Sequence, residues 1–461
     1  METLALLTCL DVKGFLLFLV VFLVVMDYLK NKNPPNYPPG PFALPFLGNI
    51  FNRDSRQNKM VFITGYKMVK EALVNQAENF VDRPYSPLAM RIYSGGLFVS
   101  NGEMWKKHRR FALSTLRNFG LGRKTLEVAI CEESCFLQDE MDRQKGEAFD
   151  PAALFNNAVS NIICQLVFGQ RFDYADHNFQ LMLKYLSEAL YEAFPAIMKH
   201  LPGSHNTLFS NYKAIYKFIG KNLAKHKEEL DPSNPRDYMD CFLIEKEVIQ
   251  NENGFTEENL FRCTLDLFAA GTETTTTALR WGFIYLIKYP QIQDKVQAEI
   301  DKVIGSSRQP CMADRPNMPY TDAVIHEILR KGDIVPLNGP RVAKNDTTLG
   351  GYFIPKGTVL MPILHSVLFD ENEWETPHSF NPGHFLDNEG RFVRRDAFLP
   401  FSAGKRVCLG EQLAWMELFL FFVSLFQKFR FSTVEGVQLD MEGFVGTTRV
   451  PCPFKIYAKE R

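Results

Sequence analysis

The sequence predicts a mainly α-helical protein with a small β part, preceded by a single N-terminal membrane-anchor helix. Three observations predict this fold class. Apolar residues recur at helical spacing through most of the 461 residues, strand patterns are short and few, and the N-terminus opens with an apolar stretch. Hydrophobic residues make up 46 % of the chain, enough for a large core, which excludes a disordered or disulfide-stapled small protein.

The apolar stretch is Leu4–Met26, interrupted by Asp11 and Lys13. As a helix it would reach about 35 Å, which is long enough to cross a bilayer. A cleaved signal peptide is the alternative interpretation, but no small-residue cleavage site follows the stretch. Lys30 and Lys32 come directly after it, so the positive-inside rule places the rest of the chain on the cytoplasmic side.

Three parts are expected along the chain. Residues 1–33 hold the anchor and its basic flank, and residues 34–48 form a proline-rich spacer. Proline fixes φ and removes hydrogen-bond donors, so this spacer should be extended and stiff. Residues 49–461 contain no further linker and no internal repeat, and are expected to form one domain.

The domain's helices are predicted from their apolar spacing and their end signals. Thr256, followed by Glu257 and Glu258, marks the start of a long helix, and Pro290 ends it after Tyr289. The other predicted helices are Lys106–Leu116 (in a region helical in pattern to about Gln144), Phe155–Phe168, Thr321–Lys331 and Cys408–Phe429. Strand patterns occur at Gly351–Ile354, Thr358–Met361 and Phe454–Ala458.

Charge and cysteine content exclude several classes of protein. The 52 basic and 53 acidic residues give a net charge of −1, so nucleic acid is not expected as a partner. The nine cysteines are odd in number and include no CxxC pair, which excludes a disulfide framework and a zinc site. Most are expected to be buried, reduced thiols.

Cys408 is the exception, because it lies between Gly404 and Gly410 just before an apolar helix. Glycines allow close backbone approach, and the amides at a helix start can donate to a sulfur anion. With Arg406 nearby, this pattern predicts an activated cysteine, either a nucleophile or an iron ligand.

The stretch Phe401…Gly404…Arg406…Cys408…Gly410 is similar to the haem-binding signature of the cytochromes P-450, FxxGxRxCxG. Three further motifs follow that family's pattern and order. They are Trp105…Arg109 (WxxxR), Ala270-Gly271-Thr272-Glu273-Thr274-Thr275 (the oxygen-binding motif) and Glu327…Arg330 (ExxR). The whole chain most resembles the microsomal vertebrate family 2 enzymes, which makes residues 49–461 a haem-thiolate catalytic domain.

The resemblance implies a haem b cofactor whose iron is bound by the Cys408 thiolate. It also implies that the haem propionates are contacted by Trp105, Arg109, Arg341 and Arg406, for which a forked guanidinium is well suited. Arg83 is a weaker candidate because its loop spacing differs from that of the family. Lys106 and Lys107 are expected to stay solvated.

In the family the residue matching Thr274 hydrogen-bonds dioxygen, and the acid matching Glu273 helps to deliver protons. Judged alone, the Gly and Thr residues of this stretch are poor helix formers, and a turn breaking the helix is the alternative. Glu327 and Arg330, judged alone, form an ordinary surface ion pair. The resemblance makes this pair buried and structural, with His384 near it.

The implied activity is monooxygenation of the unspecific-monooxygenase type, in which the haem inserts one oxygen atom of O2 into a lipophilic substrate. Electrons would come from NADPH through NADPH–cytochrome reductase, with cytochrome b5 as a further donor. The reductase would dock on Lys106–Arg110 and Lys405. The protein is expected in the endoplasmic reticulum membrane, and xenobiotics, fatty acids or steroids are its candidate substrates.

The substrate pocket of the family is formed by segments that are largely apolar here. They match Pro87–Phe98, Leu186–Leu208, Leu265–Ala269, Ile334–Leu337 and Phe444–Gly446. Two other passages are shorter than in relatives, near Phe51–Lys59 and near Ala189–Glu192. A haem-binding protein with little turnover therefore stands as the alternative function.

Overall fold

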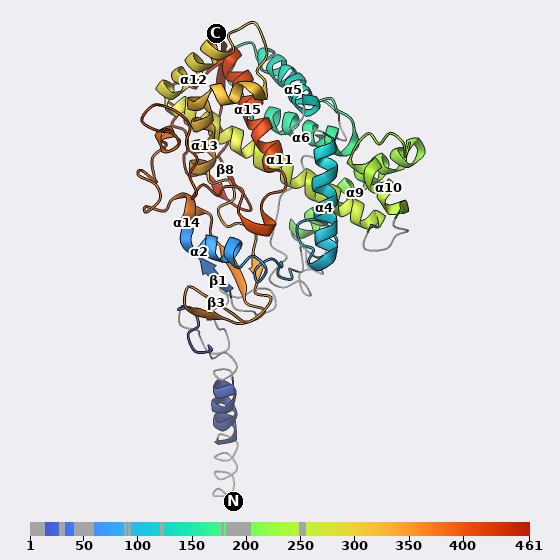
Figure 1. Cartoon of the computed structure of the whole chain (residues 1–461), viewed down its shortest axis with the longest axis vertical. Helices are drawn as coiled ribbons and strands as arrows, with labels where there is room; N and C mark the ends of the chain where they lie inside the picture. Colours follow the sequence, from blue (N-terminus) through green and yellow to red (C-terminus); the bar gives the residue numbers. More distant parts are fainter. Residues whose placement is uncertain are drawn as a thin grey trace, which may run out of the picture.

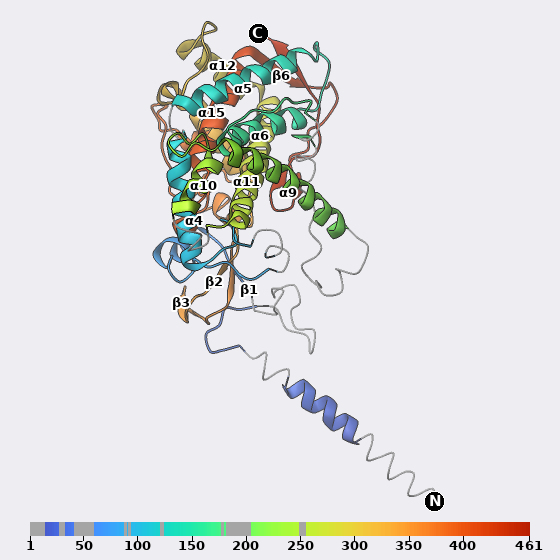
Figure 2. The ribbon, with the colours of Figure 1, turned by 90° about the vertical axis from the view of Figure 1, so that its right-hand side faces the viewer.

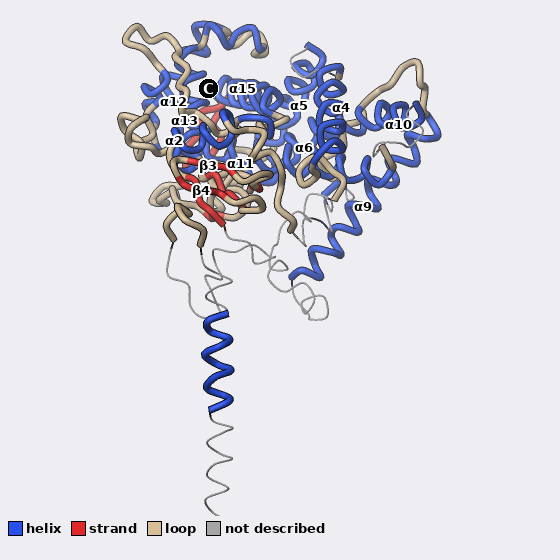
Figure 3. Tube along the Cα trace, turned by 60° about the horizontal axis from the view of Figure 1, so that its bottom comes forward, coloured by secondary structure: helices blue, strands red, loops and turns tan. Residues whose placement is uncertain are grey.

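The computed structural model describes residues 14–26, 33–40, 60–86, 90, 94–119, 124–176, 179–180, 204–248 and 255–461. Helices dominate and the strands are short, as the sequence predicts (Figure 3). The two passages predicted to be shortened, and most of the predicted pocket wall Leu186–Leu208, lie outside the described residues.

Twelve α-helices of the described chain have assigned bounds. They are α2 (Tyr66–Lys70), α4 (Gly102–Asn118), α5 (Lys124–Asp142), α6 (Ala152–Phe168), α9 (Ser204–Glu229), α10 (Tyr238–Val248), α11 (Glu257–Lys288), α12 (Pro290–Val303), α13 (Pro319–Gly332), α14 (His365–Leu368) and α15 (Glu411–Lys428), together with the helix of residues 14–26. Shorter turns are the π-helix η2 (Glu71–Asn75) and the 3₁₀ turns η4 (Met312–Asn317), η5 (Pro382–Phe385) and η6 (Gly404–Arg406).

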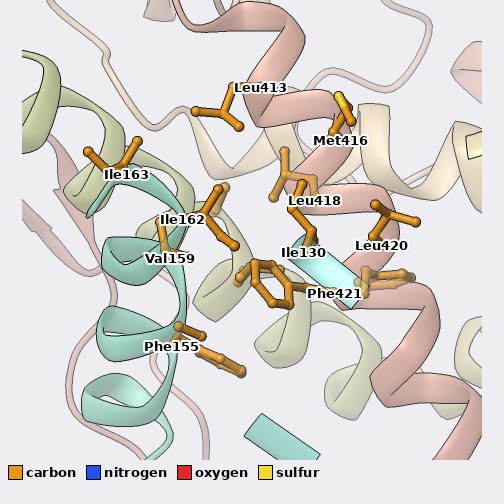
Figure 4. Close-up of a cluster of buried hydrophobic side chains, with 14 of the residues drawn as sticks. Ile130, Phe155, Val159, Ile162, Ile163, Leu413, Met416, Leu418, Leu420 and Phe421 are labelled. Carbon is orange, nitrogen blue, oxygen red and sulfur yellow. The ribbon is translucent and has the colours of Figure 1, made fainter. Parts of the chain in front are cut away.

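The long helix α11 runs through the middle of the body and packs against α6, α13 and α15 (Figure 1). Its start is capped as predicted, because the Thr256 side chain accepts a hydrogen bond from the backbone N–H of Asn259. Helix α15 is almost wholly buried and joins α5 and α6 in the main core, where Ile162, Leu418 and Phe421 lie close together (Figure 4).

Gly271 lies in the middle of α11, and the helix continues through it without a break. A Cβ at Gly271 would collide with the Ile163 side chain of α6. The glycine therefore lets α6 and α11 approach closely, and the alternative of a helix-breaking turn here is wrong.

The strands form four small sheets. β1 (Met60–Ile63) pairs in parallel with β5 (Val359–Pro362), which pairs antiparallel with β2 (Arg341–Val342). The other antiparallel pairs are β3 (Thr347–Leu349) with β4 (Tyr352–Ile354), β6 (Phe429–Thr433) with β9 (Ile456–Glu460), and β7 (Phe444–Val445) with β8 (Arg449–Val450).

The helix of residues 14–26 lies apart from the body, on the side where β1 and β3 are found (Figures 1 and 2). The first part of the predicted anchor, before residue 14, lies outside the described residues. No helix within the described ranges has both the length and the apolar character that crossing a bilayer requires. The spacer is attached to the sheet region, since the Asn36 carbonyl accepts a hydrogen bond from Phe353 of β4 at 2.7 Å.

Two boundaries differ from the sequence predictions. Helix α4 begins at Gly102 rather than Lys106, and the region predicted to stay helical to about Gln144 continues as the separate helix α5. The last helix begins at Glu411 rather than Cys408, because Cys408 belongs to the loop that follows η6.

Candidate active site

Cys408 lies at the end of a tight loop that leads into α15. Its backbone N–H donates to the Phe401 carbonyl at 2.9 Å, which closes the loop. Helix α15 starts three residues later, so the N–H groups of Gly410 and Glu411 face the sulfur and lower the pKa of the thiol. This arrangement confirms the expectation that helix-start amides point at this cysteine.

The surroundings of the Cys408 thiol act on its pKa in opposite directions. Its side chain is accessible, yet burial among surrounding atoms is the largest influence on its pKa and raises it. The Arg109 guanidinium acts in the opposite direction and favours the thiolate. A metal ion bound to the sulfur would favour deprotonation much more strongly, because only the thiolate ligates.

Gly404 allows the cysteine loop to pack closely against the backbone of η2. Its φ is +73°, and a Cβ there would collide with the backbone carbonyl oxygen of Leu73 in η2. Both the backbone conformation and the close approach require glycine at this position. The loop is therefore held against η2 by direct backbone contact.

Trp105 and Arg109 lie on one face of α4 and reach the cysteine loop. The Arg109 guanidinium donates to the Val407 carbonyl at 2.6 Å, and the Arg406 guanidinium lies 3.7 Å from the centre of the buried Trp105 ring. Three sequence-predicted residues from two distant segments are thus brought together beside Cys408.

Four arginines lie close together near the cysteine loop. Burial is the main cause that lowers the pKa of each of them, Arg83, Arg109, Arg341 and Arg406. For Arg83, Arg341 and Arg406, the positive charge of one or more of the other arginines lowers the pKa further. The values for Arg341 and Arg406 are about 10 and about 9. Among the described side chains, the buried Nη2 of Arg341 has no hydrogen-bond partner.

Such a cluster of buried cations requires an anion, because unpaired buried charge is strongly unfavourable. Asp82 counteracts the lowering of the Arg406 pKa, but it is a single carboxylate among four guanidinium groups. A haem beside Cys408 carries two propionate carboxylates, so the donor set fits this group. The structure thus brings the predicted contacts Arg109, Arg341 and Arg406 into one cluster.

Arg83, which the sequence makes the weaker candidate, lies inside the same cluster. Its guanidinium donates to the Pro340 carbonyl at 2.8 Å and lies against Gly339, where a Cβ would collide with it. The missing side chain at Gly339 makes room for Arg83. Because this contact joins residues far apart in the sequence, local spacing made Arg83 only a weaker candidate for a propionate contact.

The Thr-rich stretch of α11 contains the predicted site residues Glu273 and Thr274. Ala270 is exposed although it lies in the middle of a helix that is buried over most of its length. The Thr274 hydroxyl donates to the Ala270 carbonyl at 2.8 Å, and the Thr448 hydroxyl donates to Glu273 at 3.3 Å. Glu273 and Thr274 therefore point in different directions, as expected for adjacent helical residues.

Glu327 and Arg330 are fully buried and form two parallel hydrogen bonds of 2.7 Å. Arg330 also donates to the carbonyls of Leu368, Pro377 and Ser379, while His384 lies 3.2 Å from Glu327. The interpretation of Glu327 and Arg330 as an ordinary surface ion pair is therefore wrong. The expectation that the pair is buried and structural is confirmed.

His108, within the predicted basic face, is fully buried rather than solvated. Its ring lies 5.1 Å from that of Phe255 and 6.1 Å from that of Phe242. Lys106 and Arg110 are exposed, whereas Lys107, which was also expected to stay solvated, is partly buried.

Comparison with known proteins decides the family, because the model for cytochrome P450 matches residues 42–456. The chain belongs to the cytochrome P450 family. It is 47 % identical to cytochrome P450 2J2 of Homo sapiens over 97 % of this chain and 96 % of that protein. Similar relatives include cytochrome P450 2J1 of Oryctolagus cuniculus, 46 % identical over 97 % and 96 %, and cytochrome P450 2B4 of the same species, 42 % identical over 90 % and 92 %.

This P450 is therefore a haem-thiolate monooxygenase most similar to family 2 members. The alignment with cytochrome P450 2J2 spans 481 positions, more than the 461 residues of this chain, so the relative carries residues that this chain lacks. This agrees with the prediction that passages of the chain are shortened.

Proposed function

We propose that this P450 inserts one oxygen atom of O2 into lipophilic substrates, with electrons supplied by NADPH through NADPH–cytochrome reductase. One observation carries the proposal: Cys408, with helix-start amides directed at its sulfur, lies next to the cluster of buried arginines. Cys408 would bind the haem iron, and the propionates would be held by Trp105, Arg83, Arg109, Arg341 and Arg406. The bound haem supplies oxygen activation, which a thiolate ligand favours.

The residues of α11 handle the oxygen and its protons. Thr274 donates a hydrogen bond at the oxygen site once its hydroxyl turns away from the Ala270 carbonyl. Glu273 carries protons towards that site through water, because its carboxylate faces Thr448 rather than Thr274. These two residues are the catalytic pair of the proposal.

Exposed apolar side chains support a lipophilic substrate. Phe98, Leu337, Phe444 and Val445 are between 43 % and 66 % exposed, and all four belong to the predicted pocket segments. An apolar molecule that covered them would remove this surface from water, at about 25 cal/mol per Å². Xenobiotics, fatty acids and steroids all fit this description.

A basic surface on the cysteine side provides a docking place for the reductase and for cytochrome b5. A hollow of about 420 Å³ is lined by residues of α4 and the cysteine loop, namely Trp105, Lys106, Arg109, Arg110, Leu113, Ser114, Arg117 and Lys405. Its exposed cations favour an acidic partner, and Arg109 in its wall touches the loop that holds Cys408.

The test is reconstitution of the haem-loaded protein with NADPH–cytochrome reductase, NADPH, ¹⁸O2 and a panel of lipophilic compounds. We expect a product that carries one ¹⁸O atom, and none when the reductase is omitted. A protein that binds haem and is reduced but forms no product with any compound would favour the alternative of a haem protein with little turnover. The intact edge strand β1, which follows the shortened passage and pairs with β5, favours turnover.

We also propose that the protein is held in the endoplasmic reticulum membrane by Leu4–Met26, with residues 34–48 as a spacer and 49–461 on the cytoplasmic side. The helix of residues 14–26 supports this, because large apolar side chains such as Phe15, Leu17 and Phe18 are more than 60 % exposed. We expect protease added outside sealed microsomes to digest the body. A body that survives until detergent is added would show the opposite orientation.

A further inference from the structure

His226 is a buried histidine near the end of α9, outside the site described above. Its Nε2 lies 2.7 Å from the carboxylate of Asp237, the residue directly before α10. Its Nδ1 lies 2.7 Å from the backbone carbonyl oxygen of Asn222, one turn earlier in α9. The side chains of His226 and Asp237 are 6 % and 1 % exposed. The pair therefore joins α9 and α10, which lie side by side at the edge of the body (Figure 1).

These two contacts define how many protons the pair holds. A backbone carbonyl can only accept a hydrogen bond, so Nδ1 of His226 carries a proton. An ionised carboxylate is likewise only an acceptor, so the contact between Nε2 and Asp237 needs a second proton. A neutral imidazole has a proton on one nitrogen only. His226 is therefore an imidazolium cation that is paired with the Asp237 carboxylate inside the protein.

The neighbouring charges on α9 and α10 are already paired with one another. Arg236 donates to both carboxylate oxygens of Asp240, at 2.7 and 3.1 Å, and to Glu229 at the end of α9. The second oxygen of Asp237 accepts a hydrogen bond from the backbone N–H of Asp240 at 3.0 Å. Among the described side chains, His226 is thus the one positive partner of Asp237.

The other helices packed against this junction bring no charge that could replace the proton. Helix α6 contains no charged residue. Gly169 at its end lies against the pair, because a Cβ there would be 2.8 Å from Oδ2 of Asp237, and Gln170 donates to the Asn222 side chain at 2.8 Å. The charged groups that α11 directs at this region have partners of their own; they are Glu257 with Lys227 and Lys246, and Glu258 with Arg262.

We propose that the His226–Asp237 pair is a proton-dependent link that fixes α9 to α10 and to the end of α6. When the proton is lost, Nε2 directs a lone pair at a carboxylate, so the hydrogen bond breaks and the buried Asp237 charge loses its partner. Helix α9 begins at Ser204, inside the predicted pocket wall Leu186–Leu208. Loss of the link therefore loosens the helix that leads into this wall.

The direction of the pH dependence follows from the contacts of the ring. Burial by itself lowers the pKa of His226, but the Asp237 carboxylate and the Asn222 carbonyl outweigh it, so the pKa is raised above the usual 6.5. The stabilisation is complete below pH 6.5, where the unfolded chain is protonated as well. It is lost as the pH rises through the raised pKa of the folded protein, so the junction weakens on the alkaline side.

Hydrogen–deuterium exchange of the haem-loaded protein tests the proposal on peptides that span Asn222–Cys241. After correction for the intrinsic pH dependence of exchange, we expect local opening to increase about tenfold between about pH 6 and about pH 9, which is the effect of losing one hydrogen bond to a charged group. ¹⁵N NMR of histidine-labelled protein is a second readout. It should contain a signal that keeps both ring protons above pH 6.5 and that is missing from His226→Gln.

His226→Gln keeps a donor towards Asp237 but does not titrate, so its opening should be equal at both pH values. His326→Gln is the matched control. His326 is also buried beside an aspartate, but its contacts with the carbonyl and the carboxylate of Asp322, at 2.8 and 3.3 Å, both use Nδ1. This variant should keep the wild-type pH response in the α9–α10 peptides.

The proposal does not depend on the monooxygenase function, because exchange and NMR are measured without turnover. Opening that stays constant with pH in the wild type overturns it, and so does an equal rise in His226→Gln. Should His226→Gln fail to fold, the wild type still decides, since its peptides either open at alkaline pH or do not.

Discussion

Cys408→Ser is expected to abolish thiolate-type absorption of the haem. Only this cysteine lies at the end of the loop closed by Phe401, with the amides of Gly410 and Glu411 and the Arg109 guanidinium directed at its sulfur. A serine hydroxyl is not deprotonated in this environment and is a poor ligand for the iron. The measurement is the absorption spectrum of the purified variant, together with its haem content per chain.

Cys131→Ser and Cys311→Ser are the controls for this experiment. Both thiols are partly buried and hydrogen-bonded far from the loop, Cys131 to the Pro310 carbonyl and Cys311 to Asp314. Their spectra should equal that of the wild type. An unchanged spectrum in Cys408→Ser would refute the assignment of the ligand.

Thr274→Ala should preserve haem binding while the enzyme wastes NADPH and releases peroxide instead of product. The hydroxyl is bonded to the carbonyl of its own helix, so its loss costs no tertiary contact, and alanine is the better helix former by about half a kcal/mol. The fold should therefore be retained. Positioned proton transfer contributes a factor of about 10² or more to rate, so the loss of coupling should be large.

Thr272→Ala is the matched control within the same helix. Its hydroxyl pairs with the Ser160 hydroxyl of α6 at 3.1 Å in a buried site. We expect a loss of about 1 kcal/mol in the free energy of unfolding, measured in denaturant, and normal coupling.

Haem loss with normal coupling in Thr274→Ala would contradict the prediction for that variant and would assign Thr274 a structural role.

The elements that depend on local pattern could be predicted from the sequence. Thr256 caps α11, Pro290 follows its end, and the long apolar run after Cys408 is α15. The end of α4 was predicted to within two residues, at Leu116 instead of Asn118, whereas its start at Gly102 lies four residues before the predicted Lys106. The three predicted strands lie within two residues of β4, β5 and β9. The other strands of the described residues were not predicted, because such short strands are fixed by their partners rather than by their own pattern.

The residues of the site also divide into those that a local motif predicts and those that depend on tertiary contacts. Cys408, Arg109 and Arg406 belong to motifs with fixed spacing and could be named from the sequence. The place of Arg83 depends on its contact with Gly339, which no local pattern encodes. Burial of His108 and of the Glu327–Arg330 pair is likewise tertiary, because their spacing alone also fits an exposed helix face.

The carbon monoxide difference spectrum of the expressed, reduced wild-type protein tests the central claim most directly. It reports haem binding, thiolate ligation and an intact fold in one measurement. The account predicts the absorption of a thiolate-bound haem, at one haem per chain. A protein that binds no haem, or whose carbon monoxide complex shows the absorption of a histidine-bound haem, would contradict it.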